Sequence, residues 1–62
     1  MVKITIQPSA LIFKELPSDL LVELQEQYNL EVVKGGYQLS EEPSKLYHLL
    51  FKISFTYDLE LI

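Results

Sequence analysis

Apolar and polar residues alternate at the start of the chain, which is the pattern of a strand with one buried face. Every second residue of the segment 2–7 is apolar. Pro8 and Ser9 then give a turn signal, and the apolar segment 11–14 is typical of a second strand that returns antiparallel to the first. The chain is therefore predicted to open with a β-hairpin.

The next segment has the spacing of an amphipathic helix that begins near Pro17. Proline is tolerated in a first helical turn, and Ser18 is the alternative N-cap. Asp19 follows, where its charge complements the helix dipole. Asn29 is the expected end, since asparagine tolerates the left-handed conformation found there. The residues expected to face the interior follow helical spacing: Leu20, Leu21, Leu24, Gln27 and Tyr28.

Two short β-prone runs, 30–34 and 37–39, flank the glycine pair Gly35-Gly36. This pattern predicts a hairpin with a primed turn, because glycine accepts the positive φ angles that such a turn requires. A phosphate-binding loop needs a longer glycine pattern between a strand and a helix. The turn is therefore the favoured interpretation.

The last third of the chain changes from helical to alternating spacing. Ser40 is a candidate N-cap, and Glu41 and Glu42 would lie in the first turn of a short helix. Its interior positions are predicted to be Leu46, Leu49, Leu50 and Ile53. From position 51 to 61 every second residue is apolar, which predicts a final strand over about 53–61.

Length and composition limit the class of protein. The 62 residues are expected to form one domain over 1–62, of the α+β class, and 48% hydrophobic residues argue against disorder. The sequence contains no cysteine, which removes disulfides and thiolate chemistry. It shows neither a run of about 18 apolar residues nor the apolar block of a signal peptide. We expect a cytoplasmic protein with no membrane association.

The charges argue against direct binding of nucleic acid. Nine acidic residues stand against five basic ones, all of them lysine, for a net charge of −4. Nucleic-acid-binding domains usually carry a basic patch, often with arginine. Asp19, Glu23 and Glu26 would share one exposed face of the first helix. This acidic face is either a solvated surface or a negative patch that docks on a basic partner.

Residues that could support catalysis are sparse. His48 is the only histidine, so histidine pairs cannot build a metal site, and Ser44 one helical turn away lacks an evident orienting acid. Glu41 and Glu42 are explained by a helix start, and the outward carboxylates of the last strand are too exposed for acid–base work. We expect no enzyme, no metal and no cofactor.

Tyr37, beside the glycine pair, is predicted to be the most exposed of the four tyrosines and to act as a protein-contact anchor. The free edge of the sheet near it could accept a strand from a protein partner or from a second copy of the chain.

The order of strands and helices resembles the ubiquitin-like β-grasp family. Local similarities are the LPSD of residues 16–19 before the helix, the GYQL of 36–39 in the hairpin and the alternating 57–61. The resemblance implies a β-β-α-β-β-α-β mixed sheet packed on one main helix, with the last strand in the centre. The sequence ends without the Gly-Gly tail of the conjugated modifiers and sulfur carriers, so neither activity is expected.

These observations favour a non-catalytic protein-interaction or regulatory module. It would bind a protein partner through the acidic face (Asp19, Glu23, Glu26) or through the sheet edge near Tyr37. Two alternatives remain open: an accessory nucleic-acid-associated protein in replication, repair or phage defence, and an acidic inhibitor that mimics nucleic acid.

Overall fold

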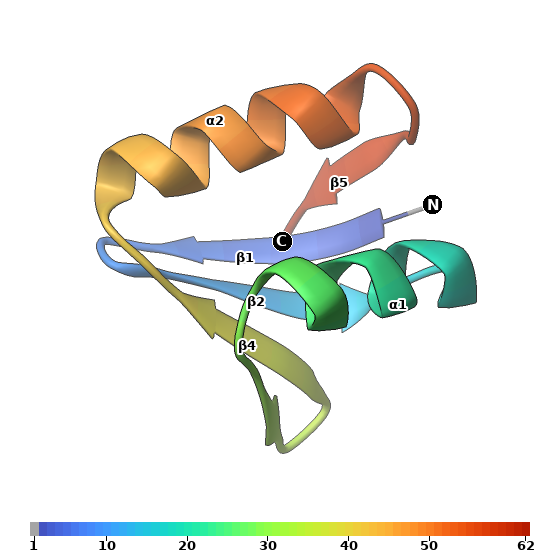
Figure 1. The fold of residues 1–62 in the computed structure, drawn as a ribbon, viewed down its shortest axis with the longest axis horizontal. Helices are drawn as coiled ribbons and strands as arrows, with labels where there is room; N and C mark the ends of the chain where they lie inside the picture. The colour runs from blue at the N-terminus through green and yellow to red at the C-terminus, as the bar shows by residue number, and fades with distance from the viewer. Residues whose placement is uncertain (1) are drawn as a thin grey trace.

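Five strands and two helices make up the computed structural model, which describes residues 2–62 (Figure 1). The strands are β1 (Val2–Gln7), β2 (Ala10–Glu15), β3 (Leu30–Val33), β4 (Gly36–Ser40) and β5 (Leu59–Leu61). The helices are α1 (Ser18–Gln27) and α2 (Pro43–Ser54). The predicted α+β class and the order of elements are confirmed.

The strands form one mixed sheet in the order β3-β4-β2-β1-β5. β1 pairs antiparallel with β2 and parallel with β5, and β4 pairs antiparallel with both β2 and β3. The expectation of a central last strand is therefore wrong. The first hairpin has two outer sides, one on β1 and one on β2. Because β4 pairs with β2, β5 pairs with β1 and becomes an edge strand of the sheet.

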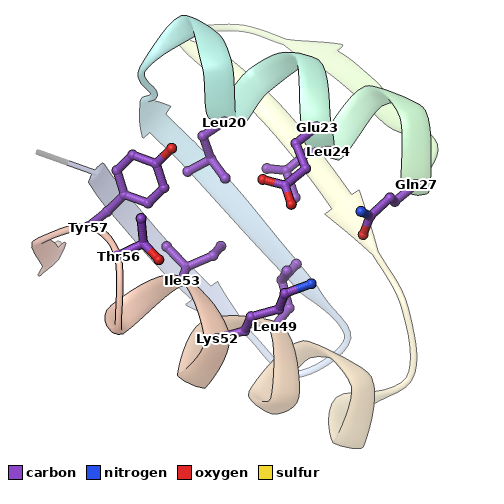
Figure 2. A pocket seen from close by; sticks show the side chains of 9 residues that line it. All are labelled: Leu20, Glu23, Leu24, Gln27, Leu49, Lys52, Ile53, Thr56 and Tyr57. Carbon is purple, nitrogen blue, oxygen red and sulfur yellow. The ribbon is translucent and has the colours of Figure 1, made fainter.

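Both helices cover the same face of the sheet, and the core lies between them (Figures 1 and 2). Paired residues point to one face, so Ile4 and its partner Phe13 are buried together under the helices. The buried core residues are Val2, Ile4, Leu11, Phe13 and Leu39 from strands, Leu20 and Leu24 from α1, and Leu46, Leu49 and Ile53 from α2. The opposite face carries mainly polar residues, with the half-buried Ile12 between Thr5 and Gln38, as expected for a sheet with one solvated side.

Ion pairs cross that polar face. The Lys3 ammonium lies 3.6 Å from a Glu15 carboxylate oxygen and 3.9 Å from one of Glu60. These contacts connect β1 to β2 on one side and to the edge strand β5 on the other.

The hairpin between β3 and β4 is confirmed, but its turn is Lys34-Gly35 rather than Gly35-Gly36. Val33 pairs with Gly36, which belongs to β4. Of the two turn residues only Gly35 has a positive φ, +85°, so the turn is not a primed one, which needs a positive φ at its first position. Gly36 serves a different purpose, because a Cβ there would collide with the backbone carbonyl of Phe13.

The ends of α1 differ from the predicted ones by a residue or two. Pro17 is the N-cap and Ser18 the first helical residue, and the Ser18 hydroxyl does not cap the helix. Asp19 lies in the first turn as predicted. The helix ends at Gln27 with an extended Tyr28, and Asn29 is not left-handed. Within the predicted interior stripe, Leu20 and Leu24 are buried and Gln27 is exposed.

The last third contains the largest correction. α2 runs to Ser54 and, with 12 residues, is longer than α1 with 10, while β5 covers only 59–61 of the predicted 53–61. Glu42, not Ser40, precedes the helix, and Pro43 is its first residue. The alternating apolar residues 51, 53 and 55 also fit a helix whose buried side is already set by Leu46 and Leu49.

The end of α2 is closed by its own backbone. The N–H groups of Thr56 and Tyr57 donate hydrogen bonds to the Ile53 carbonyl, at 3.0 and 2.9 Å. These bonds satisfy a helix-end acceptor and turn the chain toward β5.

Across residues 2–62, neither helix has the length and apolar character needed to cross a membrane.

Candidate functional site

A narrow cavity separates α1 from α2 on the helix-covered face (Figure 2). Leu20, Leu24, Leu49 and Ile53 form its apolar floor, and the rim consists of Glu23, Gln27, Lys52, Thr56 and Tyr57. Its volume of about 90 Å³ is well below the roughly 300–1,000 Å³ of small-molecule sites. The cavity is therefore a seam between two packed helices rather than a substrate pocket.

One end of this seam is closed by a hydrogen bond between its two sides. The Tyr57 hydroxyl donates to Oδ2 of Asp19 at 3.0 Å. This bond raises the pKa of Tyr57 above its ordinary value of 10.0, with smaller contributions from burial and from the charges of Asp19 and Glu23. Asp19 thus joins the start of α1 to the chain that follows α2.

The structure places the predicted acidic face partly beside α2. Asp19, Glu23 and Glu26 are all exposed. Asp19 is engaged by Tyr57, and Glu23 borders the inter-helix cavity. Glu26 lines a separate shallow hollow together with Glu41. Glu23 and Glu26 therefore border two different hollows, while Asp19 is held by Tyr57.

Tyr37 is not the exposed edge residue that the sequence suggested. It is half-buried and packs against the core. Its strand β4 lies inside the sheet, and β3 forms the edge. The residue paired with it on that edge, Val32, is 79% exposed. The ring of Tyr37 therefore packs against the core next to the edge strand and is only partly exposed to solvent.

A second hollow adjoins the inter-helix cavity, sharing Leu49 and Lys52 with it. It is lined by Tyr28, Ser44, Lys45, His48, Leu49 and Lys52. His48 and both lysines are exposed. Lys45 lies 3.7 Å from Glu41 in an ion pair. Every fully buried side chain among residues 2–62 is apolar, so the described part of the chain contains no desolvated polar group aimed into a cavity.

Sequence reasoning missed the most exposed aromatic surface. Tyr47, Phe51 and Phe55 follow one another at four-residue intervals along α2 and its last turn, and they are 62%, 64% and 75% exposed. We call these three residues the aromatic face. The rings of Phe51 and Phe55 pack edge to face, with centroids 4.8 Å apart.

The aromatic face points directly away from the core. Phe51 is two residues from both Leu49 and Ile53, which at about 100° per residue places it on the opposite side of the helix from these two buried residues. The i, i+4, i+8 spacing was visible in the sequence. Phe51 and Phe55 also fit the alternation of a strand, because residues four apart share a face in a strand as well as in a helix.

Comparisons with other proteins add no relative to this description: the chain matches no known protein family, and neither curated proteins nor solved structures show significant similarity to it.

Proposed function

We propose that this protein is a non-catalytic protein-interaction module whose binding surface is the aromatic face of α2. The observation that supports this proposal is the exposure of Tyr47, Phe51 and Phe55 on the side of the helix opposite the core. The outward side of a surface helix normally carries charged residues. Here both lysines of α2 line hollows on the α1 side instead.

Aromatic residues are costly to leave in water and are enriched at protein interfaces. Exposed apolar patches on soluble proteins mark docking sites when several residues are contiguous. Large rings also contribute disproportionately to binding energy, since each buries much area with few rotatable bonds. Three neighbouring rings on one helix fit a binding surface better than scattered surface residues do.

A capture experiment with matched variants tests the proposal. Tagged wild type and the double variant Phe51→Ser/Phe55→Ser would be exposed to lysate of the source organism, with Val22→Ser as the control. Val22 is a 52% exposed apolar residue on α1. We expect a protein captured by wild type and by the control and lost in the double variant. Retention by all three proteins would contradict the proposal.

The edge strand β3 is a second candidate surface for the same function. It presents Val32 on the helix-covered side of the sheet and unpaired backbone groups along its outer side. A partner strand could add there. In the same experiment, loss of capture with Val32→Ser and retention with the double variant would favour this edge. Loss only with Glu23→Lys/Glu26→Lys would favour the acidic face.

A nucleic-acid-associated role and nucleic-acid mimicry are the proposals from other classes. The mimic is supported by the net charge of −4. Direct binding would have to use scattered lysines, two of which, Lys3 and Lys45, lie within ion-pair distance of glutamates. Nuclease treatment before capture distinguishes these proposals, because nucleic-acid-mediated capture would disappear and capture of a protein would not.

The ubiquitin-like β-grasp is a proposal about the finer fold. It is supported by the parallel pairing of the first and last strands and by a helix packed against the hairpin that precedes it. The edge position of β5 and the length of α2 depart from it.

A further inference from the structure

We infer that the aromatic face of α2 binds the same face of a second copy of this chain, with the two helices antiparallel across a two-fold axis. This inference rests on the proposed function and names its partner. Three observations support it: the absence of lysines and carboxylates from this face, the area that it offers, and the position of glutamates on both sheet edges.

The aromatic face is suited to contact itself. A two-fold axis places a surface opposite its own copy, so any charged patch would meet a like charge. The outward side of α2 carries Tyr47, Phe51 and Phe55 and no lysine or carboxylate, and it is flanked by Ser44, His48 and Ser54. The acidic residues Asp19, Glu23 and Glu26 lie on α1, away from this side. Two copies that each carry a charge of −4 can meet here without bringing those carboxylates together.

The spacing of the rings favours an antiparallel arrangement. Phe51 lies midway between Tyr47 and Phe55, one helical turn from each. With Phe51 on the two-fold axis, Tyr47 of one copy faces Phe55 of the other at both ends of the contact. The edge-to-face pair of Phe51 and Phe55 within each copy already orients two of the rings.

The available area corresponds to a weak dimer. Aromatic side chains present roughly 150–250 Å² each, so three rings that are mostly exposed offer about 300–500 Å² per copy. A standard stable interface needs about 800 Å² per copy. A concentration-dependent equilibrium is the expected behaviour.

The edge β5 is less suited to pairing with a second copy. Asp58 and Ile62 direct backbone groups toward β1, so by alternation Leu59 and Leu61 direct theirs outward. Antiparallel pairing of two β5 strands through both leucines would place Glu60 opposite Glu60 or opposite Asp58 of the second copy. Like charges directly opposite each other destabilise a strand pair.

The edge β3 presents the same obstacle. Val33 flanks the two-residue turn and pairs with Gly36, so Leu30 and Val32 carry the outward backbone groups. A two-fold pairing through both of them would place Glu31 opposite Glu31. A glutamate in the middle of each edge strand therefore disfavours pairing of that edge with a second copy. The remaining surface for a second copy is the aromatic face of α2.

Sedimentation equilibrium of the purified chain from about 10 µM to about 1 mM tests the inference. We expect the mass of wild type to rise from one copy toward two. Phe51→Ser/Phe55→Ser should raise the dissociation constant of the dimer by about tenfold or more, because the central rings of an interface dominate its affinity. Val22→Ser should dissociate like wild type. Circular dichroism of each variant in dilute solution establishes that it is folded.

The remaining outcomes separate this inference from the proposed function. Amide chemical shifts recorded against protein concentration should change along 44–55 and stay constant along 30–33. Shifts confined to β3 or β5, or a mass of one copy at every concentration, would overturn the second-copy inference. A monomeric chain that captures a different protein through Phe51 and Phe55 retains the proposed function and loses this inference. A monomeric chain without such capture loses both.

Discussion

The Tyr57 hydroxyl and the Asp19 carboxylate, 38 positions apart in sequence, form a 3.0 Å hydrogen bond that joins α1 to the segment after α2. Tyr57 is half-buried beside the inter-helix cavity, and Asp19 lies in the first turn of α1. The bond lets one carboxylate serve two purposes, since its negative charge also complements the dipole of α1. It fixes the end of the seam between the helices.

This bond predicts a loss of stability at alkaline pH. The pKa of Tyr57 is raised in the folded protein, chiefly because its protonated hydroxyl donates to Asp19. A raised folded-state pKa contributes stability that is fully present below pH 10, the unfolded value, and is lost as the pH rises through the folded value. Urea midpoints measured from neutral to alkaline pH should differ between wild type and Tyr57→Phe, and the difference should shrink in that upper range. A constant difference would contradict the role of the hydroxyl.

The two glycines of the β3–β4 hairpin should respond differently to substitution. Gly36→Ala places a methyl group against the Phe13 carbonyl, part of a backbone that cannot move cheaply, and should cost about 1–3 kcal/mol. Gly35→Ala meets only the Lys14 ammonium at 3.7 Å, so its cost is the positive φ alone, about 1–2 kcal/mol. Gly35→Asn should recover part of that cost, whereas Gly36→Asn should not. Chemical denaturation of the four variants measures these differences.

Truncation of two phenylalanines should change stability by very different amounts. Phe13 is 0% exposed, and Phe13→Ala should lower the free energy of unfolding by about 3–5 kcal/mol. This loss is large enough to unfold most of the molecules of a domain this small. Phe51→Ala should change the stability of the dilute monomer by less than about 0.5 kcal/mol, because its ring faces solvent. Thermal unfolding in dilute solution tests both. A large loss with Phe51→Ala would mean that its ring supports the monomer.

The ion pairs on the polar face should contribute little, and in a salt-dependent way. Lys3 lies between Glu15 and Glu60, but all three side chains are about half exposed to solvent. Lys3→Met should therefore cost less than about 1 kcal/mol, and the loss should diminish in about 1 M salt. Lys34→Met makes the same charge change in the turn and serves as the control. Equal effects of the two substitutions would show that net charge, and not the Lys3 pairs, determines the response.

Most elements could be predicted from the sequence because their signals are local. The alternation in 2–7, the Pro17 start of α1 and the glycines of the β3–β4 hairpin each depend on backbone geometry within a few residues. Their ends shifted by a residue or two, since a cap is decided by packing as well as by propensity. The acidic residues of α1 were also correctly placed on the exposed surface.

The segment 51–61 and the surface of the molecule depended on tertiary structure. The alternation of apolar residues in 51–61 fits a strand. The helix nevertheless continues to Ser54, because Leu46, Leu49 and Ile53 are buried against the sheet, and Phe51 then points outward. The same packing places Tyr37 inside the sheet and β5 at its edge. Local spacing thus determines which residues can share a face, whereas the pairing of strands and the docking of helices decide which face meets solvent. The aromatic face of α2 is exposed because of the way in which α2 docks on the sheet.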